Sequence, residues 1–269
     1  MSFSLSGKTA IVTGSAAGIG LGIARHFLAK GANVMFADMD EDRLDNECGA
    51  EAKAEGPLRF FGGDLREKLT IANLLSATID AFDRVDILVN ASRLVRTSEP
   101  LNAEEDNVEL LWQQNVLTSL RLSQMTARRM ILQAEKSGSQ DGCIGSIINV
   151  SSIAAVRTMP NLLGYSMSCA AVEQMTRSMA VALAPKRIRV NAVSFASVMS
   201  ASLQSTLKDH PEYREIINKS TPMGRIAPAD ELAETVQFLA SDAASFMTGQ
   251  IVSIDGGRSL IDPAAAAAH

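Results

Sequence analysis

Short runs of β-branched and other apolar residues alternate along this chain with longer segments of helical periodicity. Such alternation is typical of βαβ units, in which each helix returns the chain to the same end of a parallel sheet. It predicts strands at residues 9–13, 33–37, 58–61, 85–89, 146–150, 188–193 and 251–254. Helices are expected at residues 18–30, 41–54, 68–82, 106–134, 162–184 and 229–240.

The predicted strands are apolar at nearly every position, as in Ile87-Leu88-Val89. This pattern is typical of a parallel sheet that helices cover on both faces. The sequence therefore predicts an α/β fold with a single doubly wound (Rossmann) sheet of seven parallel strands, flanked by helices on both faces. No internal repeat interrupts it, so we expect residues 1–262 to form a single domain, followed by a low-complexity, alanine-rich tail at residues 263–269.

Composition excludes several classes of function. The net charge is −5 and no block rich in Lys or Arg is present, which argues against a nucleic-acid partner. No run of 18 apolar residues occurs and the N-terminus lacks the apolar core of a signal peptide, so we expect no membrane span and a cytoplasmic location. The three cysteines and three histidines show no ligand spacing, so no metal site is expected.

A glycine-rich turn, Thr13-Gly14-Ser15-Ala16-Ala17-Gly18-Ile19-Gly20, joins the first predicted strand to the first predicted helix. Glycines in this context allow a tight turn and a close approach of the backbone to a pyrophosphate, which the helix N-terminus attracts. The turn predicts a dinucleotide site. Its candidate cofactor-binding residues are Gly14, Ser15, Gly18, Ile19 and Gly20.

Asp38 stands at the end of the second predicted strand. A carboxylate at this position can accept hydrogen bonds from the hydroxyls of the adenosine ribose, and it repels a 2′-phosphate. No arginine follows it directly, so the sequence favours NAD over NADP as the cofactor. Asp38 could also cap the next helix, and the two roles are compatible.

Further downstream, Ser151-Ser152 follows the fifth predicted strand, and Tyr165-Ser166-Met167-Ser168-Cys169 lies in the helix expected at 162–184. With the glycine turn, this layout resembles the short-chain dehydrogenase/reductase family, of classical type, over nearly the whole chain. The resemblance implies that Tyr165 is the general acid/base, that Ser152 holds the substrate oxygen and that Asn115 anchors a water relay. It also implies further cofactor contacts at Asp64, Leu65, Asn90 and Ser200.

The chain departs from the family's Tyr-x-x-x-Lys motif, because Cys169 stands where the lysine is expected. That lysine would bind the nicotinamide ribose and lower the pKa of Tyr165. A neutral thiol supplies no charge, and a nearby cation typically lowers the pKa of an acid by ~1–3 units. The substitution therefore predicts a degenerate active site. Cys169 itself is open to three interpretations: a buried helix residue, a redox or nucleophilic thiol, or an accidental or engineered change.

Two more departures fall near the expected nicotinamide position. The family's Asn-Asn-Ala-Gly appears as Asn90-Ala91-Ser92-Arg93, and its Pro-Gly appears as Phe195-Ala196. Arg93 thus puts a large side chain where the resemblance implies a close approach of the cofactor. Two interpretations of Arg93 stay open. It either points to solvent, or partly replaces the missing lysine by pairing with phosphate or ribose oxygens.

The resemblance implies an NAD(H)-dependent oxidoreductase that interconverts a secondary alcohol and a ketone, with an apolar or cyclic small-molecule substrate and weakened catalysis. The alternative is a non-catalytic NAD-binding or structural subunit of the same fold. The segment 200–223 is the expected substrate lid. The long helices at 106–134 and 162–184 are the expected contacts of a homodimer or homotetramer.

Overall fold

The computed structural model describes residues 3–52, 56–138 and 140–262, so the tail predicted at 263–269 lies outside the described residues. The strands are β1 (Thr9–Thr13), β2 (Asn33–Asp38), β3 (Leu58–Gly62), β4 (Ile87–Asn90), β5 (Gly145–Ser152), β6 (Ile188–Phe195) and β7 (Ile251–Ile254). They form a seven-stranded parallel sheet in the order β3-β2-β1-β4-β5-β6-β7. The predicted fold class is confirmed. The strand order reverses between β1 and β4, and this switch point opens a crevice at the carboxyl ends of the strands.

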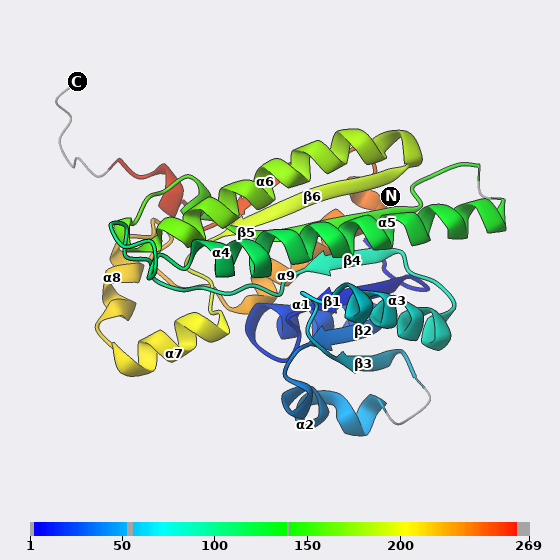
Figure 1. Cartoon of the computed structure of the whole chain (residues 1–269), viewed down its shortest axis with the longest axis horizontal. Helices are drawn as coiled ribbons and strands as arrows, with labels where there is room; N and C mark the ends of the chain where they lie inside the picture. Colours follow the sequence, from blue (N-terminus) through cyan, green and yellow to red (C-terminus); the bar gives the residue numbers. More distant parts are fainter. Residues whose placement is uncertain (1–2, 53–55, 139, 263–269) are drawn as a thin grey trace.

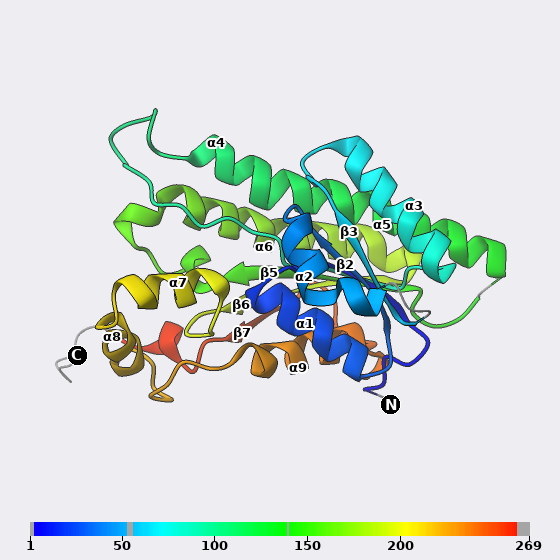
Figure 2. The ribbon, with the colours of Figure 1, turned by 90° about the horizontal axis from the view of Figure 1, so that it is seen from below.

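Helices cover both faces of the sheet (Figures 1 and 2). The helices are α1 (Gly18–Ala29), α2 (Glu41–Ala52), α3 (Lys68–Phe82), α4 (Val108–Leu111), α5 (Thr118–Ser137), α6 (Leu163–Leu183), α7 (Ala201–Asp209), α8 (Tyr213–Lys219) and α9 (Ala229–Ala240). Buried residues of α1, α2 and α9 join one hydrophobic cluster, and those of α3, α5 and α6 join another on the opposite face.

Successive residues of a strand belong alternately to these two hydrophobic clusters. Val12 and Phe36 belong to the cluster under α1 and α9, whereas their neighbours Ile11 and Met35 belong to the cluster under α3 and α5. Side chains of a strand alternate between its faces, so a strand buried on both sides needs an apolar residue at nearly every position. This explains the continuous apolar runs in the sequence.

The structure corrects the sequence prediction in two places. The single helix expected at 106–134 is broken, because a π-helical turn (Trp112–Leu117) separates α4 from α5. The expected lid segment contains α7 and α8, which were not predicted as helices; Ser200 caps α7 by accepting a hydrogen bond from the Leu203 N–H at 3.1 Å. Among the described residues, no helix is long and apolar enough to cross a bilayer.

Thr13 fixes the loop that follows β4. Its hydroxyl oxygen accepts hydrogen bonds from the N–H groups of Ala91 at 3.1 Å and Ser92 at 3.0 Å. Thr9 lies on the same strand and is equally buried, but its hydroxyl has no hydrogen-bond partner within the described part of the chain. The two threonines therefore form a matched pair.

We expect Thr13→Val to lower the free energy of unfolding by ~2–6 kcal/mol, because two loop N–H groups lose their acceptor and each unpaired donor costs ~1–3 kcal/mol. Thr9→Val removes a hydroxyl that has no partner, so we expect it to leave stability unchanged or raised. Urea denaturation of both variants measures the difference. Equal losses in the two variants would contradict this interpretation of the loop.

Candidate active site

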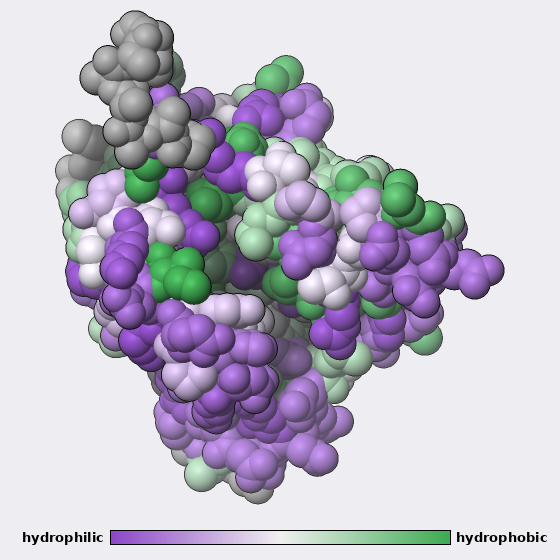
Figure 3. All heavy atoms as spheres, turned by 90° about the vertical axis from the view of Figure 1, so that its left-hand side faces the viewer, coloured by the Kyte–Doolittle hydropathy of each residue, from purple (hydrophilic) through white to green (hydrophobic). Residues whose placement is uncertain are grey.

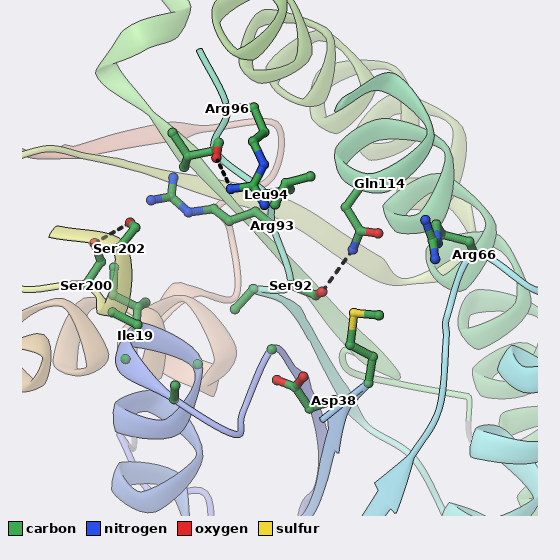
Figure 4. A pocket seen from close by; sticks show the side chains of 18 of the residues that line it. Ile19, Asp38, Arg66, Ser92, Arg93, Leu94, Arg96, Gln114, Ser200 and Ser202 are labelled. Carbon is green, nitrogen blue, oxygen red and sulfur yellow. Dashed lines mark hydrogen bonds between the residues drawn. The ribbon is translucent and has the colours of Figure 1, made fainter. Parts of the chain in front are cut away.

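A cleft of about 550 Å³ opens at the carboxyl ends of β1, β2 and β4. Figure 3 shows the hollowed face at this end of the molecule, and Figure 4 shows the cleft itself. The volume is within the usual range for small-molecule sites. The predicted residues that line it are Gly14, Gly18, Ile19, Gly20, Asp38 and Ser200.

The three glycines of the turn are required by its geometry. Gly14 and Gly18 have φ values of +68° and +57°, and a Cβ on either would lie within 2.8 Å of Ser92 or Ala201 backbone atoms. A Cβ on Gly20 would lie 2.1 Å from the Gly14 carbonyl oxygen. The turn therefore packs directly on the loop after β4 and on the start of α7. No side chain caps α1, so its first N–H groups are available to an anion in the cleft.

Asp38 is held at the end of β2 with its carboxylate in the cleft. It accepts hydrogen bonds from the N–H groups of Ala16 and Asp40, both at 3.1 Å. Asp40, not Asp38, caps α2, because the Arg43 N–H donates to the Asp40 carboxylate at 3.0 Å. Each Asp38 oxygen retains a lone pair, so the carboxylate can still accept hydrogen bonds from a ligand.

The predicted pair after β3, Asp64 and Leu65, is not among the residues that line the cleft, and its contact with a cofactor stays a prediction. Asp64 binds Arg66 through its side chain, with both carboxylate oxygens 2.9 Å from the Arg66 Nε. This hydrogen bond holds the pKa of Asp64 below its usual value. Leu65 is buried in the hydrophobic core. Arg66 lines the cleft and was missed by the sequence analysis, although its spacing of two from Asp64 could have indicated the pair.

Two predicted cofactor-binding side chains point into the protein. The Ser15 hydroxyl donates to a carbonyl oxygen of β2 at 3.3 Å. The Asn90 amide donates to Ser123 at 2.9 Å and to the Asn149 side-chain oxygen at 2.8 Å. These contacts stabilise the carboxyl ends of the strands, and neither side chain faces the cleft. Ser200 lines the cleft while it caps α7.

The predicted acid/base lies behind the cleft. Tyr165 and Cys169 occupy one face of α6 and are only 4% and 6% exposed. Ser152, at the end of β5, accepts a hydrogen bond from the Ala154 N–H at 3.2 Å. Tyr165 and Cys169 line a cavity of about 10 Å³, which has room for no more than one water molecule.

Asn115 lies on the π-helical turn, and its amide is engaged by protein groups. It accepts a hydrogen bond from the Leu94 N–H at 2.8 Å and donates to the Leu94 carbonyl at 3.0 Å and to the Ser168 hydroxyl at 3.1 Å. Asn115 thereby fixes the backbone directly after Arg93. Its role in a water relay stays a prediction.

Arg93 does not point to solvent. Its guanidinium donates a hydrogen bond to the Tyr165 hydroxyl. The guanidinium carbon also lies 4.2 Å from the centroid of the Phe195 ring and 5.7 Å from that of the Tyr165 ring, which is cation–π geometry. Cys169 completes this group, since it borders the same small cavity. The three departures from the family pattern therefore form one cluster around Tyr165.

Arg93, like its neighbour Ser92, borders two spaces. It lines both the open cleft and the small cavity behind it, whereas Tyr165 and Cys169 line only the small cavity. Figure 4 shows Arg93 and Arg96 at one end of the cleft and Asp38 at the other. The cleft with the predicted nucleotide-binding residues is thus open, while the Tyr165 hydroxyl is buried beside the Arg93 guanidinium.

Burial controls the protonation of this cluster. It raises the pKa of Tyr165 far above the ordinary value, and the opposing effects of Arg93 and the Ser152 hydroxyl are smaller. Burial also raises the pKa of the Cys169 thiol, again against the effect of Arg93. Both groups are therefore neutral at physiological pH. A thiolate is the reactive form of cysteine, so the geometry favours Cys169 as a buried helix residue.

The raised pKa of Tyr165 predicts an observable titration. The chain has two tyrosines, so Tyr213→Phe leaves Tyr165 as the only phenol. An ordinary tyrosine is half ionised at about pH 10. We expect the folded Tyr213→Phe variant to show almost no phenolate absorbance at that pH, because the proton is held to higher pH. Half ionisation at or below about pH 10, with native circular dichroism, would contradict burial of the hydroxyl.

Comparison with known proteins agrees with this architecture. The family described as enoyl-(acyl carrier protein) reductase matches residues 14–259. The chain belongs to the short-chain dehydrogenase/reductase family. An uncharacterized oxidoreductase of Thermotoga maritima is 33% identical over 258 residues, which cover 95% of this chain and 98% of the relative.

Solved structures of short-chain enzymes show the same fold with either nicotinamide cofactor. A gluconate 5-dehydrogenase from Burkholderia cenocepacia, in complex with NADP and tartrate, has a TM-score of 0.85 and 27% identity, covering 97% of this chain and 98% of its own. A 7α-hydroxysteroid dehydrogenase, complexed with NADH and 7-oxo glycochenodeoxycholic acid, has a TM-score of 0.84 and 30% identity, covering 95% of both chains. No cluster of metal-ligating side chains occurs among residues 3–52, 56–138 and 140–262.

Proposed function

We propose that this short-chain family member binds NAD in the cleft, and that its interconversion of a secondary alcohol and a ketone is strongly weakened. One observation carries the proposal. Asp38 and the glycine turn line the open cleft, whereas Arg93 is bonded to the Tyr165 hydroxyl and closes off the acid/base. On this proposal the chain still binds the nucleotide, and the proton transfer by Tyr165 is slowed.

The adenosine half of NAD fits the residues present. Asp38 would accept hydrogen bonds from the ribose hydroxyls, and the glycine turn with the N-terminus of α1 would bind the diphosphate. The negative charge of the Asp38 carboxylate would repel a 2′-phosphate, which supports NAD over NADP. The nicotinamide half does not fit while the Arg93 guanidinium lies on the Phe195 ring. When bound in full, NADH would supply a hydride and NAD would accept one.

The residual chemistry would use Tyr165 as a proton donor. With its pKa raised, Tyr165 is a protonated phenol at neutral pH. Once Arg93 moves aside, this phenol can donate a proton to a carbonyl oxygen that Ser152 holds, but it is a poor base toward an alcohol. We infer slow reduction of an apolar or cyclic ketone, the substrate class that the family resemblance implies.

Isothermal titration with NAD and NADP, followed by NADH oxidation against a panel of cyclic ketones, tests the proposal. We expect heat of binding with NAD, much weaker binding with NADP, and slow NADH oxidation. No binding of either nucleotide would overturn the proposal. Turnover at the ordinary rate of short-chain enzymes, roughly 1–1000 per second, would overturn the weakened chemistry.

The second candidate is a non-catalytic NAD-binding or structural subunit. Large apolar side chains stand exposed on the two long helices, Leu132 on α5 and Met167 and Val181 on α6. They support assembly into a homodimer or homotetramer through these helices, and the three free cysteines fit a cytoplasmic location. Light scattering tests this candidate. A monomer that oxidises NADH would exclude it.

A further inference from the structure

We propose that the cleft is built for the adenosine-diphosphate part of its ligand alone, and that ADP and ADP-ribose bind as tightly as NAD. The inference rests on the proposed nucleotide binding at Asp38. It goes further because it assigns Arg93 a defined role, which is to occupy the position that the nicotinamide end would need. The ligand class is then any adenine nucleotide that carries a 5′-diphosphate, with or without a nicotinamide.

The first support is the double attachment of the guanidinium. Arg93 donates to the Tyr165 hydroxyl and lies 4.2 Å from the Phe195 ring centroid. Both partners are fixed, since Tyr165 is 4% and Phe195 5% exposed. The Arg93 guanidinium over the Phe195 ring is planar and positively charged, as the ring of an oxidised nicotinamide is. Arg93 therefore supplies, from within the chain, the planar cation that the nicotinamide end of the dinucleotide would otherwise place there.

The second support is the backbone on either side of Arg93. Thr13 holds the N–H groups of Ala91 and Ser92, and Asn115 holds both the N–H and the carbonyl of Leu94. The Cα of Arg93 therefore cannot move far. Only rotation of the side chain could open the path to Tyr165, and rotation breaks the hydrogen bond and the cation–π contact together.

The third support is that Arg93 accounts for the two other departures. Phe195 supplies the aromatic face on which the guanidinium lies. Cys169 is small and uncharged, and its thiol lies close enough to the Arg93 charge for that charge to oppose the rise of its pKa. A lysine at 169 would put a second cation beside the guanidinium, and two like charges at such range repel strongly. The loss of the lysine thus follows from the presence of Arg93.

The rest of the cleft suits a diphosphate. Arg96 is exposed at the same end as Arg93, lines the cleft and forms no salt bridge within the described residues (Figure 4). Its guanidinium can pair with phosphate oxygens together with the N-terminus of α1. Asp38 at the opposite end supplies the acceptor for ribose hydroxyls. These groups complete a site for adenosine diphosphate without any contribution from Tyr165 or Ser152.

Calorimetric titration of the full chain with ADP, ADP-ribose, NAD and NADH tests the inference. We expect the four dissociation constants to agree within about threefold, because the nicotinamide gains no contacts. In Arg93→Gly we expect NADH to bind at least about tenfold more tightly than in the wild type, with ADP-ribose unchanged. Arg93→Ala repeats the test if the glycine variant folds poorly. The fluorescence of bound NADH should shift to shorter wavelength only in these variants.

Arg96→Ala is the matched control, since it removes a cleft arginine that touches neither Tyr165 nor Phe195. We expect it to weaken all four ligands alike. NADH that binds the wild type ten times more tightly than ADP-ribose would overturn the inference and leave nucleotide binding intact. An absence of binding by all four ligands would overturn both the inference and the proposed function.

Discussion

Replacing Arg93 by glycine and Cys169 by lysine together should raise ketone reduction with NADH at least about 100-fold over the wild type. The glycine removes the guanidinium that covers Tyr165. The lysine restores a cation one helical turn from the phenol, where it would lower the pKa of Tyr165 by ~1–3 units and so make the phenol a stronger acid toward the ketone oxygen. Steady-state NADH oxidation against a cyclic ketone measures the gain.

The single variants are the controls for this pair. Cys169→Lys alone should give no gain, because the guanidinium still covers Tyr165 and repels the new cation. Arg93→Gly alone should give less than the pair, because the pKa of Tyr165 stays raised by burial. Groups in direct contact are expected to be non-additive. A double variant that folds, binds NADH and is no faster than the wild type would contradict the role assigned to the cluster.

Asp38→Ala should lower the affinity for NAD about tenfold and remove the preference over NADP. The carboxylate loses its charge-assisted hydrogen bonds to the ribose, worth ~1.5–3 kcal/mol. It also stops repelling a 2′-phosphate, since like charges about 4 Å apart near a protein surface repel by roughly 4 kcal/mol. We therefore expect the ratio of the NADP and NAD dissociation constants to fall from roughly 1000 to near one.

Asp40→Ala is the matched control for Asp38. Asp40 lies two residues further on, is exposed, and caps α2 without lining the cleft. We expect this variant to lose some stability and to keep both the NAD affinity and the preference over NADP. Titration calorimetry of the two variants with both nucleotides measures the difference. Equal loss of NAD affinity in both would contradict the assignment of Asp38 to the ribose.

The sequence predicted the sheet well because strands buried on both faces need apolar residues at nearly every position. The bounds of α3, α9, β1 and β7 are those expected from the pattern. The break between α4 and α5 was missed, because a π-helical turn keeps the chain helical and leaves the apolar pattern nearly unchanged. The short helices α7 and α8 were missed because few of their residues are buried, so they show little apolar periodicity.

The candidate site, like the fold, could be predicted from the sequence only in part. Glycines that are needed for a positive φ or a close backbone approach can be recognised from the sequence. Gly14, Gly18 and Gly20 form the expected tight turn and line the cleft. The inward turn of Arg93 could not be predicted, because it depends on a rotamer and on a partner, Phe195, far along the chain. The closed position of Tyr165 follows from that contact. The sequence identified the three unusual residues but not their mutual contact.

A crystal structure of the wild-type chain with NAD tests most directly whether Arg93 separates the nucleotide from Tyr165. We expect the adenosine and diphosphate to lie ordered between Asp38 and the glycine turn. The Arg93 guanidinium should remain on the Phe195 ring, with no nicotinamide atom in hydrogen-bond reach of the Tyr165 hydroxyl. A nicotinamide ring ordered beside Tyr165, with Arg93 displaced from Phe195, would contradict this arrangement.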